Sequence, residues 1–411
     1  MAVLFPELRS LKKKVVQAVR SESHRAWLKW RLRKAGVTAS LTLKPAGFTK
    51  GLELFNGTPD ALQKQVAKQR TKSGLATRWL IYPACTQEYV LPKTIEPDDA
   101  AKFGPWKIWK RPPYYTYRLP RTLYHGRSGA CVDAEQHIFL DLLDWGAKGS
   151  EKLLGQEKKE AHFCRNAGVL SSSKNYYHWL IKMLPRLHLM ERIEMPPSAF
   201  DALLIEWPTL VQKDAYLHSG LSSYALRVVS SRDFWYCRNL FVTNVPHECP
   251  SWAVEYLRKL FAPLIVPTDG RPKAIYLARG KTKWRRVCNE PEVSEWLQSR
   301  GIGTVDFGTC SFEDQVRIIA AADIIIAPHG AALANIVFAK NGTRVLEIFA
   351  SPKNQKCYWM LADHRRLIYH YFMAECIDTS HDPNRWDLMI PLEKLERALD
   401  HILEDRGRWE S

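Results

Sequence analysis

The last third of the chain has the clearest alternation of hydrophobic and polar positions. Helices are expected to begin at Pro291 and after Ser311, where Asp314 completes a pattern that resembles a capping box. Short apolar runs of strand length alternate with these helices. The expected strands are 274–278, 302–306, 323–327 and 344–348. Strict alternation of strands and helices predicts a doubly wound parallel sheet.

The middle of the chain, from about residue 160, repeats this rhythm less sharply. The expected strands are 202–206, 225–229 and 240–243. A largely apolar helix is expected at about 173–191, with a kink or shift near Pro185, because proline cannot donate a helical hydrogen bond. A further helix is expected from Ser251, and a hinge-like stretch at 266–272 follows it.

The first 150 residues lack this rhythm. Frequent prolines break 40–150 into short pieces, some with strand-like alternation, so we expect an irregular, partly β region that leads into the first α/β domain. Residues 7–36 are dense in Lys and Arg, with apolar positions at helical spacing. This basic amphipathic helix fits either attachment to an anionic membrane surface or a solvated helix packed on its own domain.

The composition narrows the class of protein. With 411 residues, 46% of them hydrophobic, the chain can bury a sizeable core, and its net charge of +17 predicts attraction to polyanions. The nine cysteines are scattered without zinc-ligand spacing. No apolar run reaches the roughly 18 residues of a spanning helix, and the N-terminus lacks a signal-peptide core. We therefore expect a reduced, cytoplasmic protein without structural zinc.

The strongest local motif is 323–338, in which a buried strand runs through Pro328 into His329 and Gly330. A helix is expected to begin near Ala331, with Asn335 one turn into it. Ligands of such sheets bind beyond the carboxyl ends of the strands, where glycine permits close approach and a helix N-terminus favours phosphate. The motif predicts a phosphate site, although His329 could instead only cap the turn.

A second candidate is a polar stripe on the helix at about 173–191. Asn175, His178, Lys182 and Arg186 are spaced three, four and four residues apart, so they should share one face. A histidine in such a stripe could act as a general base, because its pKa lies near working pH. The alternative is an ordinary amphipathic surface helix.

A third candidate follows the strand at 274–278. Arg279 stands just past the strand end, and Arg285 and Arg286 lie in the basic loop after it. The planar guanidinium suits phosphate oxygens, although a charged run is commonly only a solvated loop. Glu347, near the end of another strand, could line the same site or serve a structural hydrogen bond.

Together these residues resemble glycosyltransferase family 61. Its signature helix is similar to Asn175-Tyr-Tyr-His178-Trp-Leu-Ile-Lys-Met-Leu-Pro185-Arg186-Leu187. The C-terminal half of the family is similar to a longer run of separated positions, over a resemblance that covers roughly 130–375. These positions are Tyr276, Arg279, Arg285, Arg286, Asn289, Glu290, Ser311, Phe312, Gln315, Ala322, His329, Gly330, Ala331, Asn335, Phe338, Glu347, Tyr358, Trp359, Leu361 and Ala362.

The resemblance implies a GT-B architecture, in which two Rossmann-like domains face each other across a cleft. It also implies sugar transfer with inversion, from a nucleotide sugar that is commonly UDP-linked, without an obligatory metal or other cofactor. Arg279 would then hold the diphosphate, with His329, Gly330 and Asn335 in the donor pocket and His178 on the catalytic face. The chain departs from the family at Lys182, where an acidic residue is usual, and at Ala278, where serine is usual.

The expected site has a donor side, a catalytic pair and an acceptor side. The donor side is Arg279, Arg285, Arg286, His329, Gly330, Ala331, Asn335 and Glu347. The catalytic pair is His178 and Lys182, and the acceptor side is Asn175 and Arg186. The expected partners are a nucleotide sugar and a surface-polysaccharide or lipid-linked glycan that could carry acidic groups, with peripheral contact to an anionic membrane and no nucleic acid. A catalytically inactive binding protein of the same fold is the main rival.

Five segments are expected along the chain. They are a basic N-terminal segment (1–40), an irregular region (41–130), an acceptor-side Rossmann-like domain (131–265), a donor-side Rossmann-like domain (273–375) and a C-terminal helical segment (376–411).

Overall fold

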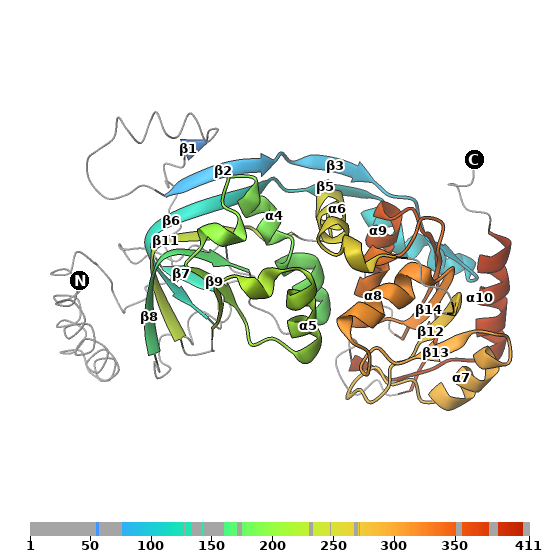
Figure 1. Ribbon diagram of the computed structural model, residues 1–411. Helices are drawn as coiled ribbons and strands as arrows, with labels where there is room; N and C mark the ends of the chain where they lie inside the picture. Colours follow the sequence, from blue (N-terminus) through green and yellow to red (C-terminus); the bar gives the residue numbers. More distant parts are fainter. Residues whose placement is uncertain are drawn as a thin grey trace, which may run out of the picture.

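A computed structural model describes most of the chain beyond residue 75. The described residues are 55–56, 76–126, 129–132, 142, 160–170, 175–229, 233–246, 248–266, 270, 272–350, 356–377 and 385–405. The basic helix expected at 7–36 lies outside them. Figure 1 shows two sheets side by side with helices packed between and around them.

The C-terminal sheet is the parallel sheet that the sequence predicts. Its order is β13-β12-β14-β15-β16-β4, and every pair of neighbours is parallel. The strands are β12 (Ala274–Leu277), β13 (Gly303–Val305), β14 (Ile324–Pro328), β15 (Arg344–Phe349), β16 (Ile368–Met373) and β4 (Lys93–Thr94). The chain order reverses between β12 and β14, the kind of switch point at which doubly wound sheets bind ligands.

The N-terminal sheet is mixed. Four neighbouring strands, β10-β9-β8-β11, run parallel. Beyond β11, the strands β6, β2 and β7 pair antiparallel, and β1 pairs parallel with β2. The strands are β1 (Phe55–Asn56), β2 (Thr77–Tyr82), β6 (Tyr114–His125), β7 (Ala130–Val132), β8 (Glu160–Val169), β9 (Ala202–Ile205), β10 (Leu226–Val228) and β11 (Asp233–Thr243). The α/β class is therefore confirmed for both halves.

The region before residue 126 is more regular than the sequence predicts. The 12-residue strand β6 continues through Pro120. Here β2 pairs with β6 only up to Arg118, and β7 pairs with it only from Leu123. β6 therefore has a described neighbour on one side alone at this point, and a proline is tolerated where a strand is locally an edge.

The same region reaches across to the C-terminal half. β3 (Cys85–Glu88) and β5 (Ile108–Arg111) form a hairpin, which Figure 1 shows running on from β2 and β6 along the top of the molecule. The Trp359 indole donates to the Val90 carbonyl at 2.6 Å. Arg111 and Tyr89 both contact the half-buried ring of His364, at 3.1 and 3.2 Å. The hairpin therefore fixes the helix that carries Trp359 and His364.

The helices of the N-terminal half include a predicted irregularity. A π-helix, η5 (His178–Met183), gives way at Pro185 to α4 (Arg186–Glu191), and the Leu184 amide donates to the Trp179 carbonyl five residues back. The shift expected near Pro185 is confirmed. The other helices here are η6 (Pro197–Ala199), α5 (Leu210–His218), η7 (Leu221–Ser223), α6 (Ser251–Leu260) and η8 (Ala262–Leu264).

Helices cover both faces of the C-terminal sheet. They are η2 (Pro97–Trp106), α7 (Glu290–Gln298), α8 (Phe312–Ala321), η9 (Ala331–Phe338), α9 (Cys357–His364) and α10 (Leu392–Glu404). The helix expected near Ala331 is a 3-10 helix. α7 and α10 bury apolar residues on one face of the sheet, and α8, η9 and α9 cover the other. A short hairpin, β17 (Glu375–Cys376) with β18 (Leu388–Met389), completes this half.

The inner face of the C-terminal sheet shares one core with the N-terminal helices. Leu180 and Ile181 of η5 belong to the same buried cluster as Phe312 of α8 and Leu333 of η9. The ring of Phe261 lies 4.7 Å from the ring of Phe312, centroid to centroid. This shared burial sets η5 against the carboxyl edge of the C-terminal sheet.

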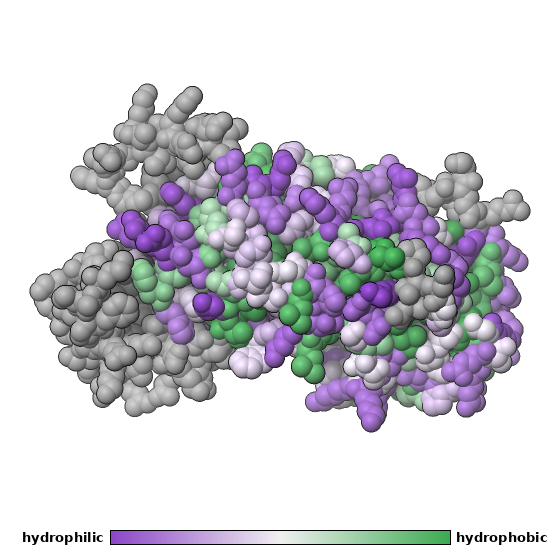
Figure 2. Space-filling view, in the orientation of Figure 1, coloured by the Kyte–Doolittle hydropathy of each residue, from purple (hydrophilic) through white to green (hydrophobic). Residues whose placement is uncertain are grey.

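Some apolar side chains remain exposed. Trp207 and, on α5, Leu210 and Leu217 are each more than 60% exposed. Figure 2 shows hydrophobic surface near the lower centre, where α5 lies in Figure 1. Within the described ranges, no helix combines the length and the hydropathy needed to cross a membrane.

Candidate active site

The candidate site lies at the carboxyl edge of the C-terminal sheet. Arg279 follows the end of β12, and His329 and Gly330 follow the end of β14. These two strands are neighbours. The motifs that the sequence predicts to form one site therefore meet at the switch point of the sheet.

Arg279 is held by the loop that follows it. Its guanidinium donates to the carbonyls of Trp284 and Arg285, each at 3.2 Å. The Glu290 carboxylate accepts the backbone amides of Arg279 at 2.7 Å and Gly280 at 3.2 Å, which fixes the strand end. Burial and the nearby charge of Arg285 lower the pKa of Arg279 to about 10. The side chain is therefore a partly desolvated cation at neutral pH.

Arg285 brings a second cation to the same place. Its side chain donates to the His329 carbonyl at 3.4 Å, while its Nε is buried and has no hydrogen bond. Neither Arg279 nor Arg285 forms an ion pair with a carboxylate of the described residues. Two neighbouring cations with no carboxylate partner among the described residues make an electropositive site that suits the oxygens of a phosphate.

Gly330 makes this arrangement possible. A Cβ atom at this position would collide with the Arg279 guanidinium. The Gly330 backbone is extended, so the reason for glycine here is space and not a left-handed conformation.

His329 is oriented by a buried carboxylate. Its Nδ1 contacts Glu347, which is fully buried, and the Tyr369 hydroxyl donates to the other oxygen of Glu347. Burial and Glu347 raise the pKa of Tyr369, which keeps the hydroxyl protonated as a donor. The His329 ring also stacks on Phe349, with centroids 5.3 Å apart. Glu347 therefore fixes the orientation of His329 from within the core.

Aromatic rings connect the predicted catalytic helix to this site. Tyr177, at the start of η5, lies 5.4 Å from the His178 ring and 5.5 Å from the Tyr358 ring. Tyr358 in turn lies 5.3 Å from the His329 ring. His178 is partly buried. The chain of ring contacts joins the η5 motif of one half to the strand-end motif of the other.

Lys182 lies on the same helix. It is partly buried, and its ammonium group lies 5.8 Å from the centre of the Tyr177 ring. No carboxylate of the described residues pairs with it. The position that is usually acidic in the family therefore adds a further cation.

Asn335 occupies a buried junction. Its side chain is 0% exposed, accepts from the Tyr176 hydroxyl at 2.7 Å and donates to Gln315 at 3.1 Å. Asn335 was expected to line the donor pocket, but these contacts show that its side chain points into the protein interior. Asn335 thus connects η5 with α8 and positions the helix that carries His178.

The other residues that the sequence assigns to the site have weaker structural links to it. Arg286 forms an ion pair with Asp387 at 2.6 Å, so its guanidinium is engaged at the start of β18. Arg186 is 3% exposed and does not share an open face with Asn175, which is exposed and accepts the His178 amide. The π-helical turn changes the angular spacing that the prediction assumed. Ala331 is partly exposed at the start of η9.

Sequence reasoning did not assign a role to Tyr358 or Glu290. Tyr358 lies between the two halves of the site, and Glu290 holds the backbone after β12. Glu290 begins α7 and looks like an ordinary acidic residue in a first helical turn. Only its place in the family motif could have singled it out.

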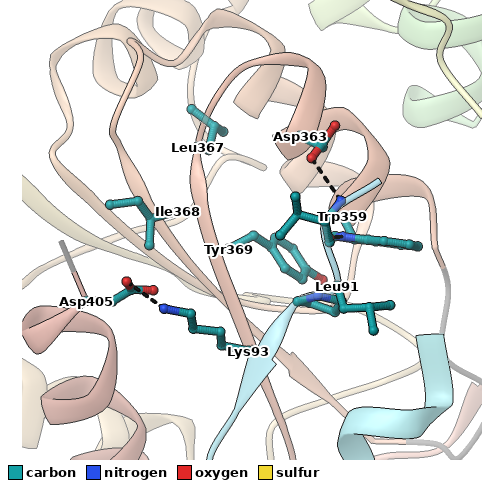
Figure 3. A pocket seen from close by; sticks show the side chains of 10 residues that line it. Leu91, Lys93, Trp359, Asp363, Leu367, Ile368, Tyr369 and Asp405 are labelled. Atoms are coloured by element: carbon teal, nitrogen blue, oxygen red, sulfur yellow. Dashed lines mark hydrogen bonds and ion pairs between the residues drawn. The ribbon is translucent and has the colours of Figure 1, made fainter. Parts of the chain in front are cut away.

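A small cavity of about 110 Å³ lies elsewhere, at the start of β16 (Figure 3). Tyr369, Trp359 and the ion pair of Lys93 with Asp405 line it. It is smaller than the ~300–1,000 Å³ usual for ligand pockets and lies at the opposite edge of the sheet from Arg279. Among the described residues, no group of His, Cys, Asp and Glu is arranged to hold a metal ion.

Comparisons with known proteins show which family the chain is similar to. Residues 176–346 match the family described as Glycosyltransferase 61. The match begins beside His178 and ends beside Glu347, so it spans the predicted catalytic and strand-end motifs.

The chain is also similar to named transferases over a shorter stretch. It is 32% identical over 108 residues to an EGF domain-specific O-linked N-acetylglucosamine transferase of Rattus norvegicus, covering 25% of this chain and 20% of the relative. It is 32% identical over 98 residues to a beta-1,2-xylosyltransferase of Arabidopsis thaliana, covering 21% and 18%. The matched stretch thus spans about a fifth of these relatives. Residues 176–346 of the chain therefore match glycosyltransferase family 61.

Proposed function

We propose that this protein transfers a hexosyl or pentosyl group from a UDP-linked nucleotide sugar to a hydroxyl group of a glycan. The two sheets would be the two Rossmann-like halves of a GT-B enzyme. Transfer would proceed with inversion and without a metal ion. The named relatives transfer N-acetylglucosamine and xylose, which is compatible with a sugar donor here.

One observation carries the proposal. Arg279 and Arg285 lie together at the switch point of a doubly wound sheet, and neither has a carboxylate partner among the described residues. Holding two cations together is unfavourable unless an anion joins them. The diphosphate of a nucleotide sugar supplies such an anion.

The chemistry follows from where the groups lie. His178 accepts the proton of the acceptor hydroxyl, whose oxygen forms a bond to the anomeric carbon. The bond from that carbon to the phosphate oxygen breaks, and the nucleoside diphosphate departs with the electron pair. Arg279 and Arg285 stabilise the negative charge that develops on it. His329, oriented by Glu347, contacts the same group from the end of β14.

The positive charge of Lys182 indicates which chemical group this position binds. A lysine ammonium group cannot act as a base while charged. Because no described carboxylate neutralises it, we propose that Lys182 binds an acidic group of the acceptor or the departing phosphate. An anionic surface polysaccharide or lipid-linked glycan would supply such an acidic acceptor group.

Turnover tests the proposal. The purified protein, in buffer with a chelator, is incubated with a panel of nucleotide sugars and candidate glycans, and release of nucleoside diphosphate is measured. We expect release from one class of donor, and His178→Ala should lower the rate by about 10²- to 10⁴-fold, the range of a lost general base. The exposed His401 on α10 provides a control, since His401→Ala should keep the wild-type rate.

A catalytically silent binding protein is the second candidate. The observation that favours it is Lys182 at a usually acidic position. Such a protein would bind the nucleotide sugar yet release nothing above background, in the wild type and in His178→Ala alike. Any release that depends on His178 excludes it.

The location of the protein is also a proposal. The net charge of +17 and the basic segment 7–36 support peripheral attachment to the inner face of a cytoplasmic membrane. Sedimentation with vesicles tests this, because binding should require anionic lipid and weaken as salt rises. Equal binding to neutral vesicles would contradict it.

A further inference from the structure

Tyr358 stands out at the junction of the two halves. It is the second residue of α9, and its ring contacts both Tyr177 of η5 and His329 after β14. The side chain of the next residue, Trp359, is held in place by its hydrogen bond to the Val90 carbonyl. The rotation of α9 is therefore fixed, and Tyr358 must face the site.

The phenol of Tyr358 has an unusual environment. The residue is only 3% exposed, yet its hydroxyl makes no hydrogen bond with any described residue. The Tyr358 hydroxyl is not among the buried polar atoms that lack a partner, so its oxygen still reaches solvent and can donate to a ligand. The positive charges of Arg279 and Arg285 both act on this phenol. Burial nevertheless raises its pKa well above the ordinary value, so it stays protonated and can donate.

We propose that Tyr358 is a ligand-binding residue whose hydroxyl donates to a phosphate oxygen of the nucleoside diphosphate. This inference rests on the proposed function and adds a third donor to Arg279 and Arg285. All three groups can donate, and among the described residues no carboxylate pairs with the two arginines. Tyr358 belongs to α9, so the diphosphate also fixes the position of this helix against β12 and β14.

A purely structural Tyr358 makes a different prediction. If the ring served only to pack between Tyr177 and His329, phenylalanine would replace it without effect on a ligand. Tyr358→Phe keeps the ring and removes only the hydroxyl. Because the hydroxyl has no hydrogen-bond partner among the described residues, this variant should fold with an unchanged thermal midpoint.

The test is calorimetric titration of the full chain with nucleoside diphosphate and, separately, with inorganic pyrophosphate. We expect Tyr358→Phe to weaken both by on the order of tenfold or more, as for a lost hydrogen bond to a charged group. Tyr224→Phe, which removes an exposed hydroxyl from the N-terminal half, should bind as the wild type does.

The outcomes separate this inference from the proposed function. If the wild type binds and Arg279→Ala does not, while Tyr358→Phe binds like the wild type, the role of Tyr358 is wrong and the site stands. If Tyr358→Phe weakens the nucleotide but not pyrophosphate, the hydroxyl contacts the nucleoside, which also overturns the phosphate contact. If the wild type binds neither probe, the proposed function itself fails.

Discussion

At the scale of single residues, Gly330 and Arg279 form a matched pair. The guanidinium lies where a Cβ at residue 330 would be, so the position of the arginine depends on the absence of a side chain. A side chain at residue 330 would therefore force the Arg279 guanidinium to move. The pair also explains why an extended glycine, with no special φ angle, stands at the end of β14.

Gly330→Ala should therefore displace the Arg279 side chain. We expect nucleoside diphosphate affinity to fall by about tenfold, the effect of weakening one charge-assisted contact. Fluorescence titration with a labelled nucleotide measures it. The control is Gly104→Ala, because a Cβ there meets nothing within 4 Å. Equal affinity in Gly330→Ala and the wild type would show that Arg279 does not reach the nucleotide.

The sequence predicts some of these residues well and others poorly. Arg279, His329 and Gly330 are predictable because strand ends of a parallel sheet converge whatever the details of packing. From the sequence, Arg286 and Asn335 look equally suited to bind a ligand. In the structure, their side chains are instead engaged by distant residues of the protein. Arg286 is taken up by Asp387, 101 residues away, and Asn335 by Tyr176, 159 residues away. Such distant pairings leave no local pattern.

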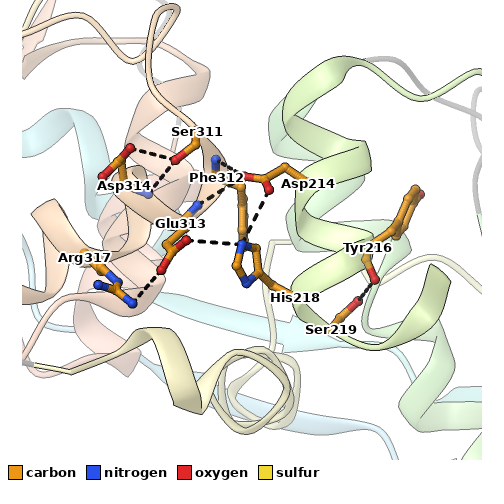
Figure 4. Close-up of polar contacts among 9 residues, drawn as sticks. All are labelled: Asp214, Tyr216, His218, Ser219, Ser311, Phe312, Glu313, Asp314 and Arg317. Carbon is orange, nitrogen blue, oxygen red and sulfur yellow. Dashed lines mark hydrogen bonds and ion pairs between the residues drawn. The ribbon is translucent and has the colours of Figure 1, made fainter. Parts of the chain in front are cut away.

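At the scale of elements, one contact ties the two halves together through a helix end. Asp214 of α5 accepts the backbone amides of Phe312 at 2.7 Å and Glu313 at 3.4 Å, the first two residues of α8 (Figure 4). His218 lies 3.5 Å from Asp214 and from Glu313. A carboxylate at a helix N-terminus satisfies free amides and complements the helix dipole.

Asp214→Ala should lower the free energy of unfolding by about 1 kcal/mol, as for a lost helix cap. Thermal unfolding followed by circular dichroism measures this change. Asp214→Asn, which keeps an accepting oxygen, should lose less, and the exposed neighbour Lys213→Ala should lose nothing. A loss from Lys213→Ala equal to that from Asp214→Ala would mean that the cap is not the cause.

The elements themselves differ in how far periodicity predicts them. Strands β12 to β15 lie within about two residues of their predicted positions, because buried parallel strands are continuous apolar runs. The π-helical form of η5 and the 3-10 form of η9 are not predicted. The spacing of apolar residues does not distinguish these helices from an α-helix, because the three types differ in which carbonyl accepts the hydrogen bond of each backbone amide.

At the scale of the whole molecule, the site exists because two halves share a core. η5 brings His178 and Lys182 from one half, and β12 and β14 bring Arg279 and His329 from the other. The contacts of Tyr176 with Asn335 and of Tyr177 with Tyr358 join the residues just before η5 to η9 and α9 of the C-terminal half.

The sequence predicts two α/β regions but not how the first 126 residues connect them. Those residues supply β2 and β6 to one sheet and β4 to the other. Such pairings join residues hundreds of positions apart, for example Lys93 with His370, and short strands among prolines give no sign of them. Periodicity predicts elements, whereas the assembly of sheets depends on burial across the whole chain.

The most direct test of the central claim is calorimetric titration of the protein with a panel of nucleoside diphosphates in the presence of a chelator. We expect one nucleotide class to bind and Arg279→Ala to weaken that binding by at least about tenfold. Arg300→Ala, which removes an arginine that pairs with Glu396, should leave the affinity unchanged. Absence of binding to every nucleotide, or equal weakening by Arg279→Ala and Arg300→Ala, would contradict a diphosphate site at the ends of β12 and β14.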